Sequence, residues 1–306
     1  MKRPLLWALA LLVPAALYIL GAAHGAPRPE YSPSTTQHAR LNPNTIYHPD
    51  EFAYVGIPYR MLLHKEWNPH YYHNPSLNLY TNLGMFMLSN AKALPHNTDY
   101  GEREIAPFAL YFSARYFSAL YTLLSVVLSY LAGRVAFNRK AGIITAALLG
   151  LSPLMVQHAH YATPIAQTTL LSTAAVAWAV LLLRDRLPLW IGCAVGGLLV
   201  GLAMSARYNA ATVGVVSGLA MLAVTGQQRR FLPLLAGAAA LPLGFALGTP
   251  GIIFATHEVT GQIQDILDWY KTEGGGPGFT AERGLESFYY HWRYVALVAL
   301  GPAALL

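Results

Sequence analysis

The sequence has few charged residues and a single cysteine. Only 11% of its 306 residues are charged, whereas soluble domains have about 25%, so the composition excludes an ordinary soluble domain. With Cys193 as the only cysteine, a disulfide-stapled secreted scaffold is excluded as well. Hydrophobic residues make up 55% of the chain, which excludes intrinsic disorder. The composition indicates a membrane protein.

Long apolar runs are abundant, and about 20 residues suffice to cross a hydrocarbon core of about 30 Å. They predict an all-α polytopic membrane protein with about eight transmembrane helices. The runs lie at about 4–24, 107–132, 141–161, 164–183, 188–206, 209–225 and 231–254, and an eighth begins near 292. The run at 188–206 is rich in Gly and Ala, which favours close contact between helices in lipid.

The basic residues predict the orientation. With a cytoplasmic N-terminus, the inner side receives nine of the 20 Lys and Arg in short connections, as the positive-inside rule requires. These are Lys2, Arg3, Arg134, Arg139, Lys140, Arg184, Arg186, Arg229 and Arg230. All 11 His, and every Asp and Glu except Asp185, fall on the outer side. The net charge of +6 thus reflects topology and gives no reason to expect nucleic-acid binding. We expect an integral protein of the plasma (inner) membrane with its active site on the extracytoplasmic side.

These runs divide the chain into five segments. The expected segments are a first transmembrane helix or signal anchor (1–25), an outer loop (26–106), a six-helix transmembrane region (107–254), a second outer loop (255–291) and the start of a further membrane helix (292–306). The first segment also resembles a cleavable signal peptide, because small residues follow its apolar run. The last is too short to span, which predicts that the chain is a fragment.

The first outer loop contains two amphipathic stretches that are too polar to span. One covers 50–67 and is expected to kink or divide at Pro58. The other is expected to begin with Asn74 as its N-cap and Pro75 as its first residue. Such juxtamembrane helices lie in the headgroup plane or pack on each other as a small outer domain.

The second outer loop repeats this pattern. Apolar residues recur at helical spacing over 263–270 and predict another amphipathic helix. The glycine-rich stretch 273–278 follows it and is a lid over a site or a flexible linker.

The tetrapeptide His48-Pro49-Asp50-Glu51 is the first candidate for chemistry. Proline favours an extended backbone at His48, which places both acids in the first turn of a helix. Backbone N–H groups there stabilise a carboxylate and fix its direction, as a general base requires. The alternative is that the two acids only complement the helix dipole.

A second motif follows about 20 residues later, Asn68-Pro69-His70-Tyr71-Tyr72-His73-Asn74-Pro75-Ser76-Leu77-Asn78-Leu79-Tyr80. Together with the tetrapeptide it resembles the first outer loop of the C-type glycosyltransferase superfamily. The branch it resembles contains protein O-mannosyltransferases and aminoarabinose transferases, membrane enzymes that take a sugar from a polyprenyl phosphate.

Further motifs extend the resemblance over roughly residues 45–255. They are Arg115 at the start of a membrane helix, Leu151-Ser152-Pro153, Gln157 to Pro164, and Gly201 to Ala210. Two positions depart from the pattern. Ile165 stands where many relatives have Asp, and Arg207 stands where the family often has Lys.

The resemblance implies roles for four residues. Asp50 is the expected catalytic carboxylate, with Glu51 beside it. Asp50 accepts the proton of the acceptor hydroxyl while that oxygen attacks the anomeric carbon and inverts it. Arg115 and Arg207 are expected to bind the phosphate of the donor, although either could instead be a snorkelling or dipole-complementing residue at a helix end.

The resemblance also implies a set of substrate-binding residues. They are His48, His70, Tyr72, His73, Asn74, His158, His160, Tyr161, Tyr208 and Asn209. No cofactor is predicted. The histidines could converge on a divalent metal, but no compact ligand motif is present, and hydrogen bonding to substrate or interfacial packing is the other interpretation.

The sequence therefore predicts a membrane glycosyltransferase of the cell envelope, mannosyltransferase-like and typical of protein glycosylation. Its expected partners are a polyprenyl phosphate sugar donor, membrane lipid and an acceptor that is a protein, lipid or glycan. Two alternatives stay open. One is a transporter or lipid translocator, although no charged residue lies clearly at a helix midpoint. The other is a catalytically degenerate binding protein of the same fold.

Overall fold

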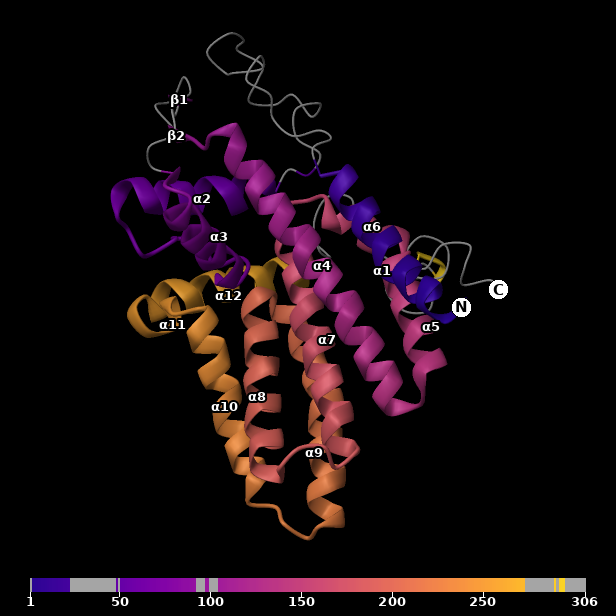
Figure 1. Ribbon diagram of the computed structural model, residues 1–306. Helices are drawn as coiled ribbons and strands as arrows, with labels where there is room; N and C mark the ends of the chain where they lie inside the picture. The colour runs from indigo at the N-terminus through magenta and orange to yellow at the C-terminus, as the bar shows by residue number, and fades with distance from the viewer. Residues whose placement is uncertain are drawn as a thin grey trace.

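The chain folds into a bundle of helices with a layer of short helices across one end (Figure 1). The computed structural model describes residues 2–22, 48, 50–91, 97–98, 104–272, 289 and 292–294. Its elements are α1 (Lys2–Leu20), α2 (Glu51–His64), α3 (Leu77–Leu88), β1 (Asn97–Thr98), β2 (Glu104–Ile105), α4 (Phe108–Ala136), α5 (Arg139–Gly150), α6 (Pro153–Ala159), α7 (Pro164–Leu183), α8 (Leu189–Ala206), η3 (Tyr208–Thr212), α9 (Val213–Gln227), α10 (Pro233–Gly248), α11 (Gly251–Phe254) and α12 (Thr256–Thr272).

The all-α prediction holds for nearly all the described residues. The exception is an antiparallel pair of two-residue strands, in which Asn97 lies opposite Ile105 and Thr98 opposite Glu104. This pair falls in the segment before α4 where we expected only loop. It is too short to change the helical architecture.

The described residues support fewer spans than the eight expected. Four helices are long and apolar enough to cross a membrane: Ala109–Ala136, Pro164–Leu183, Leu189–Ala206 and Tyr208–Gln227. Leu11–Leu20 and Pro233–Gly248 are apolar but shorter, and the run expected from 292 lies mostly outside the described residues. The coarser prediction of an all-helical chain with several membrane helices is confirmed, whereas the number eight is not.

The expected span at 141–161 is broken. It consists of α5 and α6, which meet at an angle of 60° and form at most one bent span. The break lies at Leu151 and Ser152, and Pro153 begins α6. A proline has no N–H to continue the helical hydrogen bonds and disfavours helical backbone in the residue before it, so one straight helix cannot pass through this point.

Helices α2, α3, α11 and α12 gather at one end of the bundle, which we call the loop end (Figure 1). The turns α4–α5, α7–α8 and α9–α10 lie at the opposite end. Pro58 neither splits nor ends α2, which runs unbroken to His64. The N-cap of α3 is Ser76 and not Asn74, so that prediction was two residues too early.

Helices α2 and α3 pack on each other and on the bundle. Val55 and Tyr59 of α2 share a buried cluster with Phe86 of α3 and Leu110 of α4. Asn82 Nδ2 donates to the carbonyl oxygen of Tyr54 at 2.8 Å. Buried polar groups also join α3 to α7, since Asn78 Nδ2 donates to Gln167 Oε1 at 3.2 Å. Helices α2 and α3 are therefore packed firmly against α4 and α7.

Helices α8 and α10 approach each other closely through glycine. A Cβ atom at Gly197 would overlap the carbonyl of Gly237, and one at Gly201 would overlap the carbonyl of Leu241. Gly244 of α10 makes the reciprocal approach to Leu198 of α8. The close contact expected from the Gly- and Ala-rich run is confirmed.

We expect the Gly201→Ala variant to be destabilised by about 1–3 kcal/mol, the usual cost of overpacking a well-filled interface. The added methyl would meet backbone atoms of α10, which cannot rotate aside. Thermal unfolding of the purified protein in detergent measures the change. Gly218→Ala is the matched control, because nothing lies within 4 Å of a Cβ there. Equal melting temperatures for the two variants would contradict the close approach.

Candidate functional site

Asp50 directly precedes α2 and is open to solvent. Its side chain is 59% exposed, and its Oδ2 lies 3.8 Å from His48 Nδ1. The side chain makes no capping hydrogen bond, because the backbone of Asp50 is already helical (φ −70°, ψ −16°) and does not fold the carboxylate over the first turn. The expectation that first-turn N–H groups hold this carboxylate is wrong. The site instead offers an exposed acid with a histidine beside it.

Glu51, the next residue, is fully buried in an ion pair with Arg115. Nε and Nη2 of Arg115 donate to the two carboxylate oxygens at 2.8 and 2.6 Å. Arg115 Nη1 also donates to the carbonyl of Ala22 at 3.2 Å, and the backbone N–H of Ala162 donates to Glu51 at 2.7 Å. Glu51 therefore does not reach a substrate, and the Arg115 guanidinium is not presented to a phosphate. The pair instead joins α2, α4 and the α6–α7 turn.

The α6–α7 turn lies beside His48, two residues before Asp50. The ring of Tyr161 is 5.2 Å from that of His48 and 6.1 Å from that of His158. Gln157 Nε2 donates to the hydroxyl of Tyr161 at 3.2 Å. Three of the predicted substrate-binding residues are thus brought together next to Asp50.

Tyr54 lies one helical turn after Asp50 on α2. It is buried, and its ring is 6.3 Å from that of Tyr71, which is in turn 5.7 Å from His73. Burial raises the pKa of Tyr54; Tyr71 and the negative charge of Asp50 raise it further, and the positive charge of Arg207 lowers it. The charges of Asp50 and Arg207 thus shift the pKa of Tyr54 in opposite directions.

Arg207 ends α8 in an extended conformation (φ −152°, ψ 135°) and is half-buried. The next residue, Tyr208, donates its hydroxyl to the carbonyl of Tyr72 at 2.9 Å, whereas Asn209 is exposed in η3. Arg207 thus directly precedes the residue that binds the α2–α3 loop.

His158 and His160 diverge. His160 Nε2 lies 2.8 Å from the carbonyl oxygen of Leu17 in α1, and its ring packs on Gly21. His160 is therefore a packing residue between α6 and α1, which agrees with the interfacial-packing interpretation of this residue. Among the described residues no three His, Cys, Asp or Glu are arranged to hold a metal ion.

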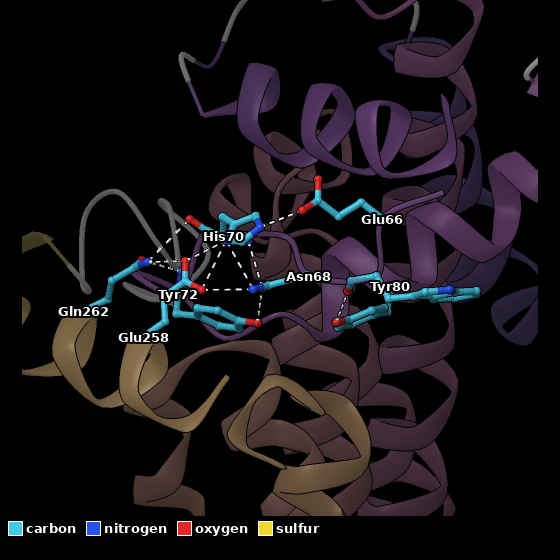
Figure 2. A network of polar contacts seen from close by, with 8 residues as sticks. Glu66, Asn68, His70, Tyr72, Tyr80, Glu258 and Gln262 are labelled. Carbon is cyan, nitrogen blue, oxygen red and sulfur yellow. Dashed lines mark hydrogen bonds and ion pairs between the residues drawn. The ribbon is translucent and has the colours of Figure 1, made fainter. Parts of the chain in front are cut away.

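His70 and Tyr72 belong to a polar network between the α2–α3 loop and α12 (Figure 2). His70 Nε2 is 2.7 Å from Glu66 Oε1, and His70 Nδ1 is 3.1 Å from Glu258 Oε1. Tyr72 is fully buried, and its backbone N–H donates to Gln262 at 2.6 Å. Both residues were expected to bind substrate, but their polar groups are engaged within the protein. His73 is exposed, and Asn74 is half-buried in the bend before α3.

We expect the stability that His70 contributes to fall with rising pH. Hydrogen bonding to Glu66 raises its pKa above the ordinary value of 6.5, burial opposes this, and Glu258 adds to the increase. A raised folded-state pKa means that the stabilisation is fully present below about 6.5 and is lost as the pH rises through the folded-state pKa. Melting temperatures measured from pH 6 to 9 should fall more for the wild type than for His70→Gln. Parallel curves would contradict this.

One comparison with known proteins gave a family match. Residues 105–252 match the family described as dolichyl-phosphate-mannose-protein mannosyltransferase. The match covers slightly less than half of the chain. The resemblance to the C-type glycosyltransferase superfamily is thus confirmed over these residues. Neither the comparison with curated proteins nor the comparison with solved structures gave a match.

The segment that matches the family contains part of the candidate site. It extends from β2 to α11 and contains Arg115, His158, Tyr161 and Arg207, whereas Asp50 precedes it. With four to five candidate spans and a membrane glycosyltransferase family, the chain is an integral membrane protein.

Several residues of the site were missed by the sequence analysis. Tyr54 follows Asp50 by four residues, so helical spacing could have placed it on the same side. Tyr71 lies inside the second motif but was not selected. Glu258 and Gln262 carry no local signal, because their partners lie about 190 residues away in the sequence.

Proposed function

We propose that this protein transfers a sugar from a polyprenyl phosphate to a hydroxyl group of an acceptor at the site around Asp50. The family description names dolichyl-phosphate-mannose, which supports a lipid-phosphate donor and favours mannose as the sugar. A hydroxyl acceptor is proposed because the attacking group must give a proton to the carboxylate of Asp50.

In the proposed reaction Asp50 is the general base. The acceptor oxygen attacks the anomeric carbon, its proton passes to the Asp50 carboxylate, and the bond between that carbon and the phosphate oxygen breaks. The electron pair of the broken bond leaves with the polyprenyl phosphate. Attack opposite the leaving group inverts the anomeric configuration, as in inverting glycosidases.

Arg207 is the proposed partner of the departing phosphate. A guanidinium stabilises the negative charge that develops on the leaving oxygens, and its fork matches phosphate geometry. Arg115 is not assigned this role, because its guanidinium already binds Glu51 inside the protein. We propose that Glu51 and Arg115 instead position Asp50 by fixing the first turn of α2.

One observation carries the proposal. An exposed carboxylate, that of Asp50, lies beside His48, and the ring of His48 is 5.2 Å from that of Tyr161 in the segment that matches the family. The candidate base thus borders the family segment, which also contains the candidate phosphate-binding residue Arg207. The rings of His48 and Tyr161 beside Asp50 offer a surface against which a sugar can stack.

We expect Arg207→Gln to lower kcat by about 10²–10³, the loss seen when one charge-stabilising donor is removed from an active site. Arg207→Lys should retain more activity, because the positive charge is kept. The assay follows transfer of radiolabelled mannose from polyprenyl phosphate mannose by the purified protein in detergent.

Arg60→Gln is the matched control, since Arg60 is an exposed arginine on α2. If Arg207 only complemented the dipole of α8, its loss would lower the melting temperature and leave kcat unchanged. That result would remove Arg207 from the phosphate site. No transfer by the wild type with any lipid-phosphate sugar would contradict the proposed function itself.

A further inference from the structure

The α2–α3 loop depends on partners outside itself for its conformation. Residues 66–76 form no helix or strand, and His70 has a left-handed backbone (φ 52°). This conformation costs a non-glycine residue about 1–2 kcal/mol, so contacts elsewhere must offset it. The network in Figure 2 provides such contacts.

Two residues of α12 hold this loop. Glu258 accepts a hydrogen bond from Asn68 Nδ2 at 3.0 Å and lies 3.1 Å from His70 Nδ1. Gln262 accepts from the backbone N–H of Tyr72 at 2.6 Å, and its amide donates to the carbonyl of His70 at 3.4 Å. The loop backbone is thus bound through side chains that lie one helical turn apart on α12.

Tyr72 transmits this constraint to the site. Its hydroxyl donates to Asn68 Oδ1 at 2.7 Å and packs against Gly251 of α11, while its carbonyl accepts from Tyr208. Tyr208 directly follows Arg207, and Tyr71 directly precedes Tyr72. One buried residue therefore links α12 to Tyr71, its neighbour in the chain, and to Tyr208, the neighbour of Arg207.

We propose that Glu258 and Gln262 are positioning residues that hold Tyr71 and Arg207 in place around Asp50. This proposal rests on the proposed function, because it concerns the geometry of that transfer site. Neither residue of α12 needs to touch the substrate. The second outer loop thus contributes, through α12, residues that position the transfer site.

The test combines a structural readout with a kinetic one. Glu258→Gln should make the backbone amides of residues 68–73 exchange about tenfold faster with deuterium, the effect of losing a charge-assisted hydrogen bond. It should lower kcat for mannose transfer by about tenfold or more, since a 1 Å misplacement can cost on the order of 10², with little change in the KM for polyprenyl phosphate mannose. Glu258→Asp should recover part of both effects.

Asp265→Asn is the matched control, since Asp265 is an exposed acid on the same helix outside the network. Faster exchange in Glu258→Gln with unchanged kcat would overturn the positioning role, and so would unchanged exchange. A wild-type protein that transfers no sugar would overturn the proposed function and this inference with it. The first two results overturn the inference alone.

Discussion

Asp50→Asn is expected to lower the rate of sugar transfer by about 10²–10⁴, the usual contribution of a general base. Asparagine keeps the size and shape of the side chain but cannot accept the proton of the acceptor hydroxyl. The fold should not change, because the Asp50 side chain makes no capping hydrogen bond and is largely exposed. Initial rates of mannose transfer from polyprenyl phosphate mannose measure the loss.

The control for this variant is Asp265→Asn, which removes an exposed carboxylate from α12 at a distance in sequence from the site. It should transfer at the wild-type rate. Membrane insertion and melting temperature should be the same for the wild type, Asp50→Asn and Asp265→Asn. Normal transfer by Asp50→Asn would remove Asp50 from the role of base.

Breaking the buried ion pair is expected to have the largest effect on stability. Arg115→Met leaves the Glu51 carboxylate buried without its partner. Glu51→Gln leaves the Arg115 guanidinium buried without its negatively charged partner. Removing one member of such a pair typically costs about 3–5 kcal/mol. Because Asp50 directly precedes Glu51, transfer should also fall in both variants. Thermal unfolding in detergent and the transfer assay measure the two effects.

The double variant Glu51→Gln, Arg115→Met separates pairing from phosphate binding. With both charges absent no uncompensated charge remains, so the double variant should be more stable than either single variant. If Arg115 bound the donor phosphate instead, Arg115→Met would keep the wild-type melting temperature and raise the KM for the donor. That result would contradict the positioning role of the pair.

Local sequence patterns predicted the elements well and their ends less well. Hydrophobic length located α4, α7 and α8, and helical spacing located α2, α3 and α12. Pro153 indicates a break in the helix, but the apolar residues on both sides of it favoured the prediction of one continuous span at 141–161. The N-cap of α3 was misplaced because Asn74 and Ser76 are both favourable capping residues.

The pairing of charges could not be predicted, since it depends on tertiary contacts. Arg115 has the residue type of a phosphate ligand, yet its partner Glu51 lies 64 positions earlier in the chain. His70 was predicted to bind substrate, but in the fold its Nδ1 lies next to Glu258, which is 188 positions later in the chain. Residue type indicates what a side chain can bind, and the fold decides what it meets.

The most direct test of the transfer reaction is mass spectrometry of both products after incubation with polyprenyl phosphate mannose and a hydroxyl-bearing acceptor mixture. We expect the wild type to release polyprenyl phosphate and to add one hexose to an acceptor in equal amounts, with inverted anomeric configuration. Asp50→Asn should form neither product at a comparable rate. Release of the lipid phosphate without a glycosylated product, or equal product formation by the two proteins, would contradict the account.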